Sequence, residues 1–130
     1  MKNRIINLKI QIFLLVVIAL SYGCAGSPYQ TQAIAEQHKE AMVNLQPDIS
    51  PSQVQNLMGP PDKTELHRGK NDEPILIYLY ITEGKDLYSR KWSEANYTPV
   101  VFVDQKLMGW GWGYLNRTAK QYEFIIKDLY

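Results

Sequence analysis

The segment from Tyr97 to Leu115, YTPVVFVDQKLMGWGWGYL, constrains the fold of this chain more than any other. Two apolar, β-prone runs flank a short polar turn at Asp104-Gln105, a pattern that predicts an antiparallel hairpin. A two-residue turn pairs Phe102 with Leu107, whereas a three-residue turn would reassign every side chain of one strand relative to the other. We favour the two-residue turn.

The second run of this hairpin alternates small and large residues up to Leu115. Because successive side chains of a strand point to opposite faces, one face would be nearly bare and the other aromatic. A bare face lets another backbone approach closely, so we expect helices on the face that carries Gly109, Gly111 and Gly113. The opposite face would then carry an aromatic surface, which we predict to bind a partner: Tyr78, Tyr80, Tyr97, Trp110 and Trp112, with Trp92 from a nearby loop.

The N-terminus has the pattern of an export signal. Three basic residues lie within the first nine positions, and an unbroken apolar run follows from Ile12 to Leu20. This run is too short to span a bilayer, so residues 1–23 read as a signal peptide and not as a transmembrane helix.

The single cysteine, Cys24, directly follows this segment. A lone cysteine is often a small buried apolar residue, but here it precedes a linker-like stretch, residues 25–30. The segment LSYGC resembles the lipobox of bacterial lipoproteins, whose cysteine is acylated and becomes the new N-terminus. The resemblance implies a membrane anchor at Cys24, and the alanine at position 25 implies the periplasmic face of the outer membrane. With one cysteine, no internal disulfide can form.

The charge of the chain argues against nucleic acid as a partner. Removing residues 1–23 would delete three basic residues and no acidic one, leaving 11 basic against 13 acidic residues, a charge of −2. Neutralisation of phosphates by basic residues is the main sequence-independent source of nucleic-acid affinity.

Two helices are expected after the linker. The first begins near Thr31 and ends before Pro47, and His38 falls on its apolar stripe, where we expect a packed, hydrogen-bonded side chain. The second begins at Ser50 with a capping box and a hydrophobic staple and ends at Gly59 in a left-handed cap. Its buried residues should include Val54, Leu57 and Met58.

The stretch ISPSQVQNLMGPPD resembles the SmpA/OmlA (BamE-like) lipoprotein motif, "GM(S/T)xxxVxxLLGxP". Asp48-Ile49 replaces the Gly-Met pair of that motif, and the matching residues are Ser50, Val54, Leu57, Met58, Gly59 and Pro61. The resemblance implies a lipid-anchored α+β domain, residues 31–130, similar to the BamE and β-lactamase-inhibitor folds. Two N-terminal helices would pack on one face of a three- to four-stranded antiparallel sheet.

The remaining segments complete this expectation. Residues 62–67 form a first strand that ends at an exposed His67, and residues 75–81 form a central strand with apolar residues on both faces. A long loop covers residues 82–96. The tail, Asn116 to Tyr130, is predicted as a short amphipathic helix that covers the aromatic surface; pairing as a further strand and docking on a partner are the alternatives.

No catalytic set, cofactor motif or metal-ligand spacing emerges from the sequence. The two histidines lie in unrelated contexts, and GWGWG lacks the loop-to-helix setting in which backbone N–H groups bind phosphate. We therefore expect a non-enzymatic lipoprotein that binds a protein partner or assists envelope assembly. The alternatives are a periplasmic ligand- or glycan-binding module that uses the Trp/Tyr face, and an inhibitor of a periplasmic enzyme.

Overall fold

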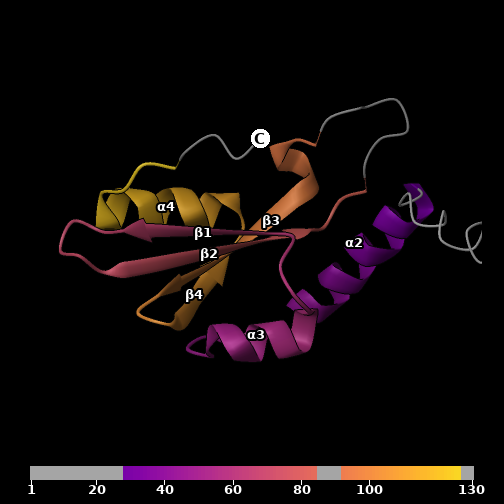
Figure 1. Cartoon of the computed structure of the whole chain (residues 1–130), viewed down its shortest axis with the longest axis horizontal. Coiled ribbons are helices and arrows are strands. Elements are labelled where there is room, and N and C mark those ends of the chain that lie inside the picture. Colours follow the sequence, from indigo (N-terminus) through magenta and orange to yellow (C-terminus); the bar gives the residue numbers. More distant parts are fainter. Residues whose placement is uncertain (1–27, 85–91, 127–130) are drawn as a thin grey trace, which may run out of the picture.

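The computed structural model describes residues 28–84 and 92–126, which form an α+β domain (Figure 1). Its antiparallel sheet has the order β1-β2-β3-β4, so strands that are consecutive in the sequence are neighbours in space. The strands are β1 (Lys63–Arg68), β2 (Pro74–Ile81), β3 (Tyr97–Val103) and β4 (Lys106–Trp110). The helices are α2 (Pro28–Met42), α3 (Pro51–Met58), the 3₁₀ turn η1 (Glu94–Asn96) and α4 (Trp112–Tyr122). The predicted fold class is confirmed.

Two apolar clusters lie on opposite faces of the sheet. On one face, α3 and the end of α2 pack over Leu76, Tyr78 and Tyr80 of β2. On the other face, α4 lies against β3 and β4, and its Leu115 joins the cluster that contains Ile75, Ile77 and Leu79 of β2. Figure 1 shows α4 and α3 on opposite sides of the strands, with α2 crossing one end of the sheet. β2 is therefore buried on both faces, as its sequence predicts.

The hairpin has the predicted two-residue turn. Asp104 and Gln105 both have positive φ, 49° and 63°, as a type I′ turn requires, and Phe102 pairs with Leu107. One residue later the register shifts, because Val101 pairs with Gly109 and Met108 is left over as a bulge. The bulge moves Gly109 onto the α4 face, so the expectation that the glycines share the face of the N-terminal helices is wrong.

The second strand is also shorter than predicted. β4 ends at Trp110, and Gly111, with φ 92°, turns the chain into α4. Trp112 and Tyr114 are consequently helical residues, and the predicted strand through Leu115 is wrong. The helix expected from residue 116 starts four positions earlier, since the alternation of glycine and tryptophan does not exclude a helix start.

The helix α3 has the predicted N-terminus. The Ser50 hydroxyl accepts a hydrogen bond from the Gln53 N–H (3.3 Å), and the Gln53 side chain accepts one from the Ser50 N–H (2.8 Å). Its C-terminal Gly59 has φ 84° but ψ −177°, so the cap is not the predicted left-handed one. Pro60 explains the difference, because a proline pushes the preceding residue to extended ψ. Leu57 is 49% exposed and not buried as predicted, while Val54 and Met58 are buried.

The first helix begins earlier than predicted, at Pro28 in place of Thr31, and ends at Met42, before Pro47 is reached. Part of the expected linker, residues 24–30, is therefore helical. The predicted signal peptide and Cys24 lie outside the described residues, as do positions 85–91 of the long loop.

Candidate interaction site

The structure does not bring the six predicted partner-binding aromatic residues together. Tyr78 and Tyr80 are buried under α3, and Tyr97 is buried on the opposite face of the sheet. The side chain of Trp110 is 39% exposed at the end of β4. The half-buried Trp92 and Trp112 adjoin Tyr97: the Trp92 ring lies 5.7 Å from the Tyr97 ring, and the Trp112 Nε1–H donates to the Tyr97 carbonyl (2.9 Å). The single aromatic surface is thus a wrong expectation, because it assumed an unbroken strand parity from Tyr97 to Leu115.

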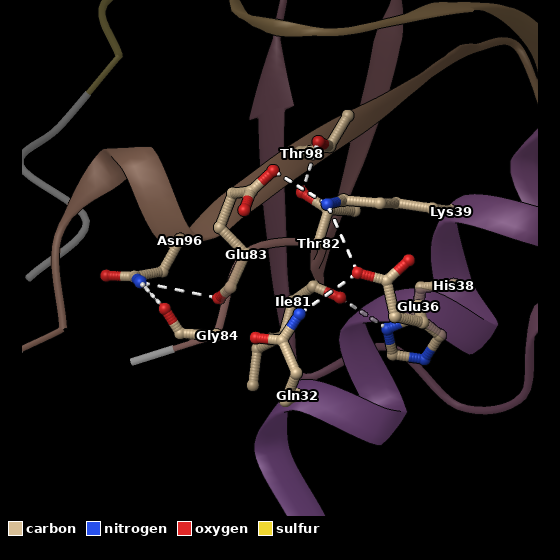
Figure 2. Close-up of polar contacts among 10 residues, drawn as sticks. All are labelled: Gln32, Glu36, His38, Lys39, Ile81, Thr82, Glu83, Gly84, Asn96 and Thr98. Carbon is tan, nitrogen blue, oxygen red and sulfur yellow. Dashed lines mark hydrogen bonds and ion pairs between the residues drawn. The ribbon is translucent and has the colours of Figure 1, made fainter. Parts of the chain in front are cut away.

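A polar cluster joins α2 to the end of β2 and the start of β3 (Figure 2). The ammonium group of Lys39 lies 2.8 Å from a carboxylate oxygen of Glu83 and 3.6 Å from one of Glu36. The Asn96 side-chain amide donates to the carbonyls of Glu83 and Gly84, at 3.3 and 3.1 Å. The two carboxylates raise the pKa of Lys39, Glu83 being the main cause, so this lysine stays charged.

His38 is the buried centre of this junction. Its Nδ1–H donates to the Ile81 carbonyl (2.8 Å), and its ring meets the Tyr80 ring edge-on with centroids 5.0 Å apart. Asp62 accepts a hydrogen bond from the Ile81 N–H (2.7 Å) and lies 3.9 Å from His38. The prediction of a packed, hydrogen-bonded histidine is confirmed, and these polar groups hold α2 on the sheet.

Two tyrosines of the core, Tyr80 and Tyr97, have a raised pKa. Burial, followed by the nearby Tyr78 and Asp62, raises the pKa of Tyr80 well above its ordinary value. Burial, followed by Asp62, likewise raises the pKa of Tyr97. The Tyr80 hydroxyl donates to the Gly59 carbonyl (3.0 Å), which links the core to the end of α3. A tyrosine held in its neutral form is suited to structural hydrogen bonding and not to proton abstraction.

The second histidine, His67, was expected in solvent, but its side chain is only 11% exposed. Its Nε2 lies 2.9 Å from a Glu65 carboxylate oxygen, and its ring contacts the Phe124 ring at 5.0 Å between centroids. The tail after α4 folds back over β1 and covers this ring, a contact that the local sequence does not reveal.

A groove of about 390 Å³ lies between α3 and the segment that connects it to α2. No charged side chain is among its lining residues, which are four amides and two apolar residues: Asn44, Gln46, Ile49, Gln53, Asn56 and Leu57. Val43, 84% exposed, immediately precedes this lining. Sequence reasoning missed this site, although amides recur through NLQPDISPSQVQN and could have indicated it.

The groove borders the outer edge of the sheet. The Asp48 N–H donates to the Leu107 carbonyl (2.9 Å), and the Leu107 N–H donates to the Ile49 carbonyl (2.8 Å). Asp48 has φ 64°, the left-handed conformation of the first residue of a G1 bulge. The lining residue Ile49 is thereby hydrogen-bonded to β4, so the groove adjoins the edge of the sheet.

The described residues show no inorganic centre. Among them, no three His, Cys, Asp or Glu side chains come together as a metal site would require. Of the helices in the two described ranges, none combines the length and hydrophobicity needed to cross a bilayer.

Comparison with known proteins assigns a family. No curated protein and no solved structure was found to match the chain. A family model described as "Protein of unknown function (DUF3192)" matches residues 16–117, which include Cys24, α2, α3 and the whole sheet. The chain therefore belongs to the DUF3192 family of proteins of unknown function.

Proposed function

We propose that this protein is a non-enzymatic lipoprotein, anchored through Cys24 at the periplasmic face of the outer membrane, that binds an envelope protein through its amide-lined groove. The groove carries the proposal. It offers hydrogen-bond donors and acceptors without charge, beside the exposed apolar side chain of Leu57. A neighbouring polypeptide presents the same combination, backbone N–H and C=O groups beside apolar side chains.

The proposed anchor places this groove near other envelope proteins. The basic and apolar segment before Cys24 supports export and acylation. The path from Cys24 to the start of α2 at Pro28 is four residues, which span at most about 14 Å when fully extended. The domain would therefore stay close to the bilayer surface, where membrane-bound partners are concentrated.

The similarity to the SmpA/OmlA motif supports the finer proposal of a role in envelope assembly. The structure gives a physical reason for one departure from that motif: Asp48 stands where the motif has glycine, and its φ is 64°. Aspartate is among the few residues that adopt this conformation at modest cost. Asp48 can therefore take a conformation that glycine also adopts, just before the capped helix α3.

Site-specific photocrosslinking tests the proposed groove. A benzophenone amino acid at Leu57 should give a discrete adduct with an envelope protein in intact cells, whereas the same residue at the exposed Lys120 of α4 should not. The double variant Asn44→Ala, Asn56→Ala should weaken the Leu57 adduct, because it removes amide groups that line the groove and leaves the capping box of α3 intact. An adduct of undiminished yield in that variant would contradict a groove-bound partner.

The anchor is tested separately. Cys24→Ser should abolish metabolic acyl labelling and leave an uncleaved or soluble periplasmic species. Labelling that persists in this variant would rule out Cys24 as the lipidation site while leaving the groove proposal open.

A small-molecule ligand is the second candidate, because amide side chains also hydrogen-bond sugar hydroxyls. The Trp/Tyr face that the sequence predicted for stacking on sugars does not form a single exposed surface, since Tyr78, Tyr80 and Tyr97 are buried. Titration with peptidoglycan fragments should shift the side-chain amide NMR signals of Gln53 and Asn56 if the groove binds glycans. Unchanged signals, together with a Leu57 adduct, would favour the protein partner.

A further inference from the structure

The two outer edges of the sheet differ in the backbone hydrogen bonds that they make. On the β4 side, Asp48 and Ile49 hydrogen-bond to Leu107 and occupy part of the edge. On the other side, β1 ends the sheet order and pairs with β2. In the described part of the chain, no backbone hydrogen bond outside the sheet reaches Thr64, Leu66 or Arg68. An uncovered edge of this kind is a template for another strand.

The backbone groups that face outward on β1 follow from the turn that joins it to β2. The Gly69 N–H donates to the Glu73 carbonyl (2.9 Å), and residues along an antiparallel pair alternate between inward and outward bonding. Residues 63, 65 and 67 therefore direct their backbone groups to β2. The N–H and C=O groups of Thr64, Leu66 and Arg68 point away from the sheet.

The side chains of β1 do not block an incoming strand. Leu66 is 78% exposed on the α3 face, where it pairs with the buried Leu76. The Glu65 carboxylate faces His67, and Arg68 pairs with Asp72 at 3.1 Å. The Lys63 ammonium lies over the Tyr97 ring, 4.8 Å from its centroid. Each charged side chain thus has a partner within its own chain. This pairing lowers the charge repulsion that usually keeps a second strand away from an exposed edge strand.

Three registers of β1 self-pairing keep outward residues opposite outward residues and centre on Glu65, Leu66 or His67, in the middle of the strand. A register centred on Glu65 places two carboxylates opposite each other, and one centred on His67 places two imidazoles opposite each other and Leu66 opposite Arg68. The register centred on Leu66 places leucine opposite leucine, Glu65 opposite His67, and Thr64 opposite Arg68. Unlike or apolar pairs directly across a ladder stabilise it, and like charges destabilise it.

We propose that β1 is a dimerisation strand that pairs antiparallel with β1 of a second copy, centred on Leu66. The two sheets would then form one continuous eight-stranded sheet with a two-fold axis through the leucine pair. A hollow of about 320 Å³ beside Leu66, lined also by His67, Arg68 and Pro74, gives the partner's side chains room. This surface is separate from the amide-lined groove, which lies at the β4 side.

In a symmetric contact, the sequence KTELHR lies opposite itself, so its side chains must be complementary to their own reversed order. This self-complementarity favours a second copy over an unrelated strand. In the Leu66-centred register, each strand presents Glu65 and His67 to the partner's His67 and Glu65. These are non-hydrogen-bonded positions, where side chains across a ladder approach most closely. An unrelated partner would need that complementary pattern by chance.

A charge-swap experiment on the full-length protein in detergent tests the dimer, with native mass spectrometry as the readout. The wild type should give twice the mass of one chain. Leu66→Asp and Leu66→Lys should each be monomeric, with Kd raised at least about tenfold, because each places like charges opposite each other on the two-fold axis. Mixing the two variants should restore a dimer that contains one copy of each.

Two further measurements keep the test decisive. Circular dichroism should show both variants folded, since Leu66 is largely exposed in the single chain. Leu66→Pro removes one outward N–H and should therefore also give a monomer. The variant should still fold, because an edge strand tolerates proline on its solvent side. A monomeric wild type, or folded single variants that remain dimeric, would overturn the proposal. A mixture that stays monomeric would overturn the Leu66-centred register.

Discussion

Three glycines of the GWGWG segment have three different environments. A Cβ atom on Gly109 would lie 2.7 Å from the Tyr114 ring, which packs against this position. Gly111 has open space around it but a φ of 92°, a conformation that side chains other than hydrogen disfavour. Gly113 lies in the first turn of α4, where a Cβ would be 3.8 Å from the Arg117 guanidinium. Only the first glycine is required for close packing.

Gly109→Ala should lower the free energy of unfolding by about 1–2 kcal/mol, because the added methyl group displaces the Tyr114 ring. The matched substitution Gly113→Ala should be neutral or stabilising by up to about 1 kcal/mol, since alanine favours the helix. Urea denaturation of both variants measures the difference. In a Tyr114→Ala background, Gly109→Ala should cost less than about 0.5 kcal/mol. An unchanged cost there would mean that the ring is not the obstacle.

Gly111→Val should also destabilise, by about 1–3 kcal/mol, through backbone strain. Sequence reasoning expected a loss above about 2 kcal/mol from overpacking against a helix, but no atom other than chain neighbours lies within 4 Å of the added Cβ. Gly111→Ala separates the two causes, because backbone strain persists with a single methyl group whereas overpacking by so small a side chain should nearly vanish. Denaturation curves that overlay those of the parent protein would show that the turn tolerates a side chain.

Tyr80 should make the fold sensitive to alkali. Its pKa is raised in the folded protein, chiefly by burial, whereas an unfolded tyrosine ionises near pH 10. Stability from this group is complete below about pH 10 and falls above it, by up to about 1.4 kcal/mol per pH unit. Urea denaturation at several pH values should show the decline, and Tyr80→Phe should flatten it despite losing the hydrogen bond to Gly59. An equal slope in Tyr80→Phe would place the alkaline sensitivity elsewhere, with Tyr97 the next group to test.

At the scale of elements, sequence patterns predicted what depends on near neighbours. The capping box at Ser50, the two-residue turn at Asp104-Gln105 and the doubly buried β2 all follow from local chemistry, and the structure has each of them. The burial of His38 was likewise predictable from the sequence, because this residue lies on the apolar stripe of its helix.

Features that depend on distant contacts were not predictable in this way. The bulge at Met108 reverses the face of every later residue, and nothing in its own sequence marks it. Gly111 reads equally well as part of a strand or as the start of a helix. The cover over His67 joins segments that lie far apart in the sequence. The groove beside α3 is lined by residues 44–57 alone, so its amides are visible in the sequence, but their arrangement around one hollow depends on how the chain folds between α2 and α3.

The helix α4 is a structural cover for one face of the sheet. Leu115 is fully buried against Ile77 and Val101, while Ile125 is 81% exposed. Leu115→Ala should therefore cost about 2–5 kcal/mol, and Ile125→Ala less than about 0.5 kcal/mol, by thermal and urea denaturation. A chain truncated before Asn116 should not fold, as judged by circular dichroism, because most of α4 is lost. A folded truncation with newly quenchable tryptophans would instead make the tail an adjustable cover.

At the scale of the whole molecule, the start of α2 and the turn between β1 and β2 lie at opposite ends of the long axis (Figure 1). If Cys24 is acylated, the short path to Pro28 holds the first end near the bilayer and directs the second away from it. The orientation of the domain relative to the bilayer would then follow from the short length of the tether alone.

This arrangement predicts a gradient of proximity to lipid. In bicelles that contain a gadolinium-chelating lipid, the backbone amides of residues 31–35 in α2 should broaden strongly, and those of residues 69–71 should not. A flexible linker of about 20 Gly and Ser residues inserted between Gly26 and Ser27 has an end-to-end distance of about 25 Å and should remove the contrast. Cys24→Ser should remove broadening at both ends. Equal broadening at the two ends in the unmodified protein would show that the tether does not orient the domain. A contrast that survives the long linker would instead assign orientation to direct contact between the domain surface and lipid.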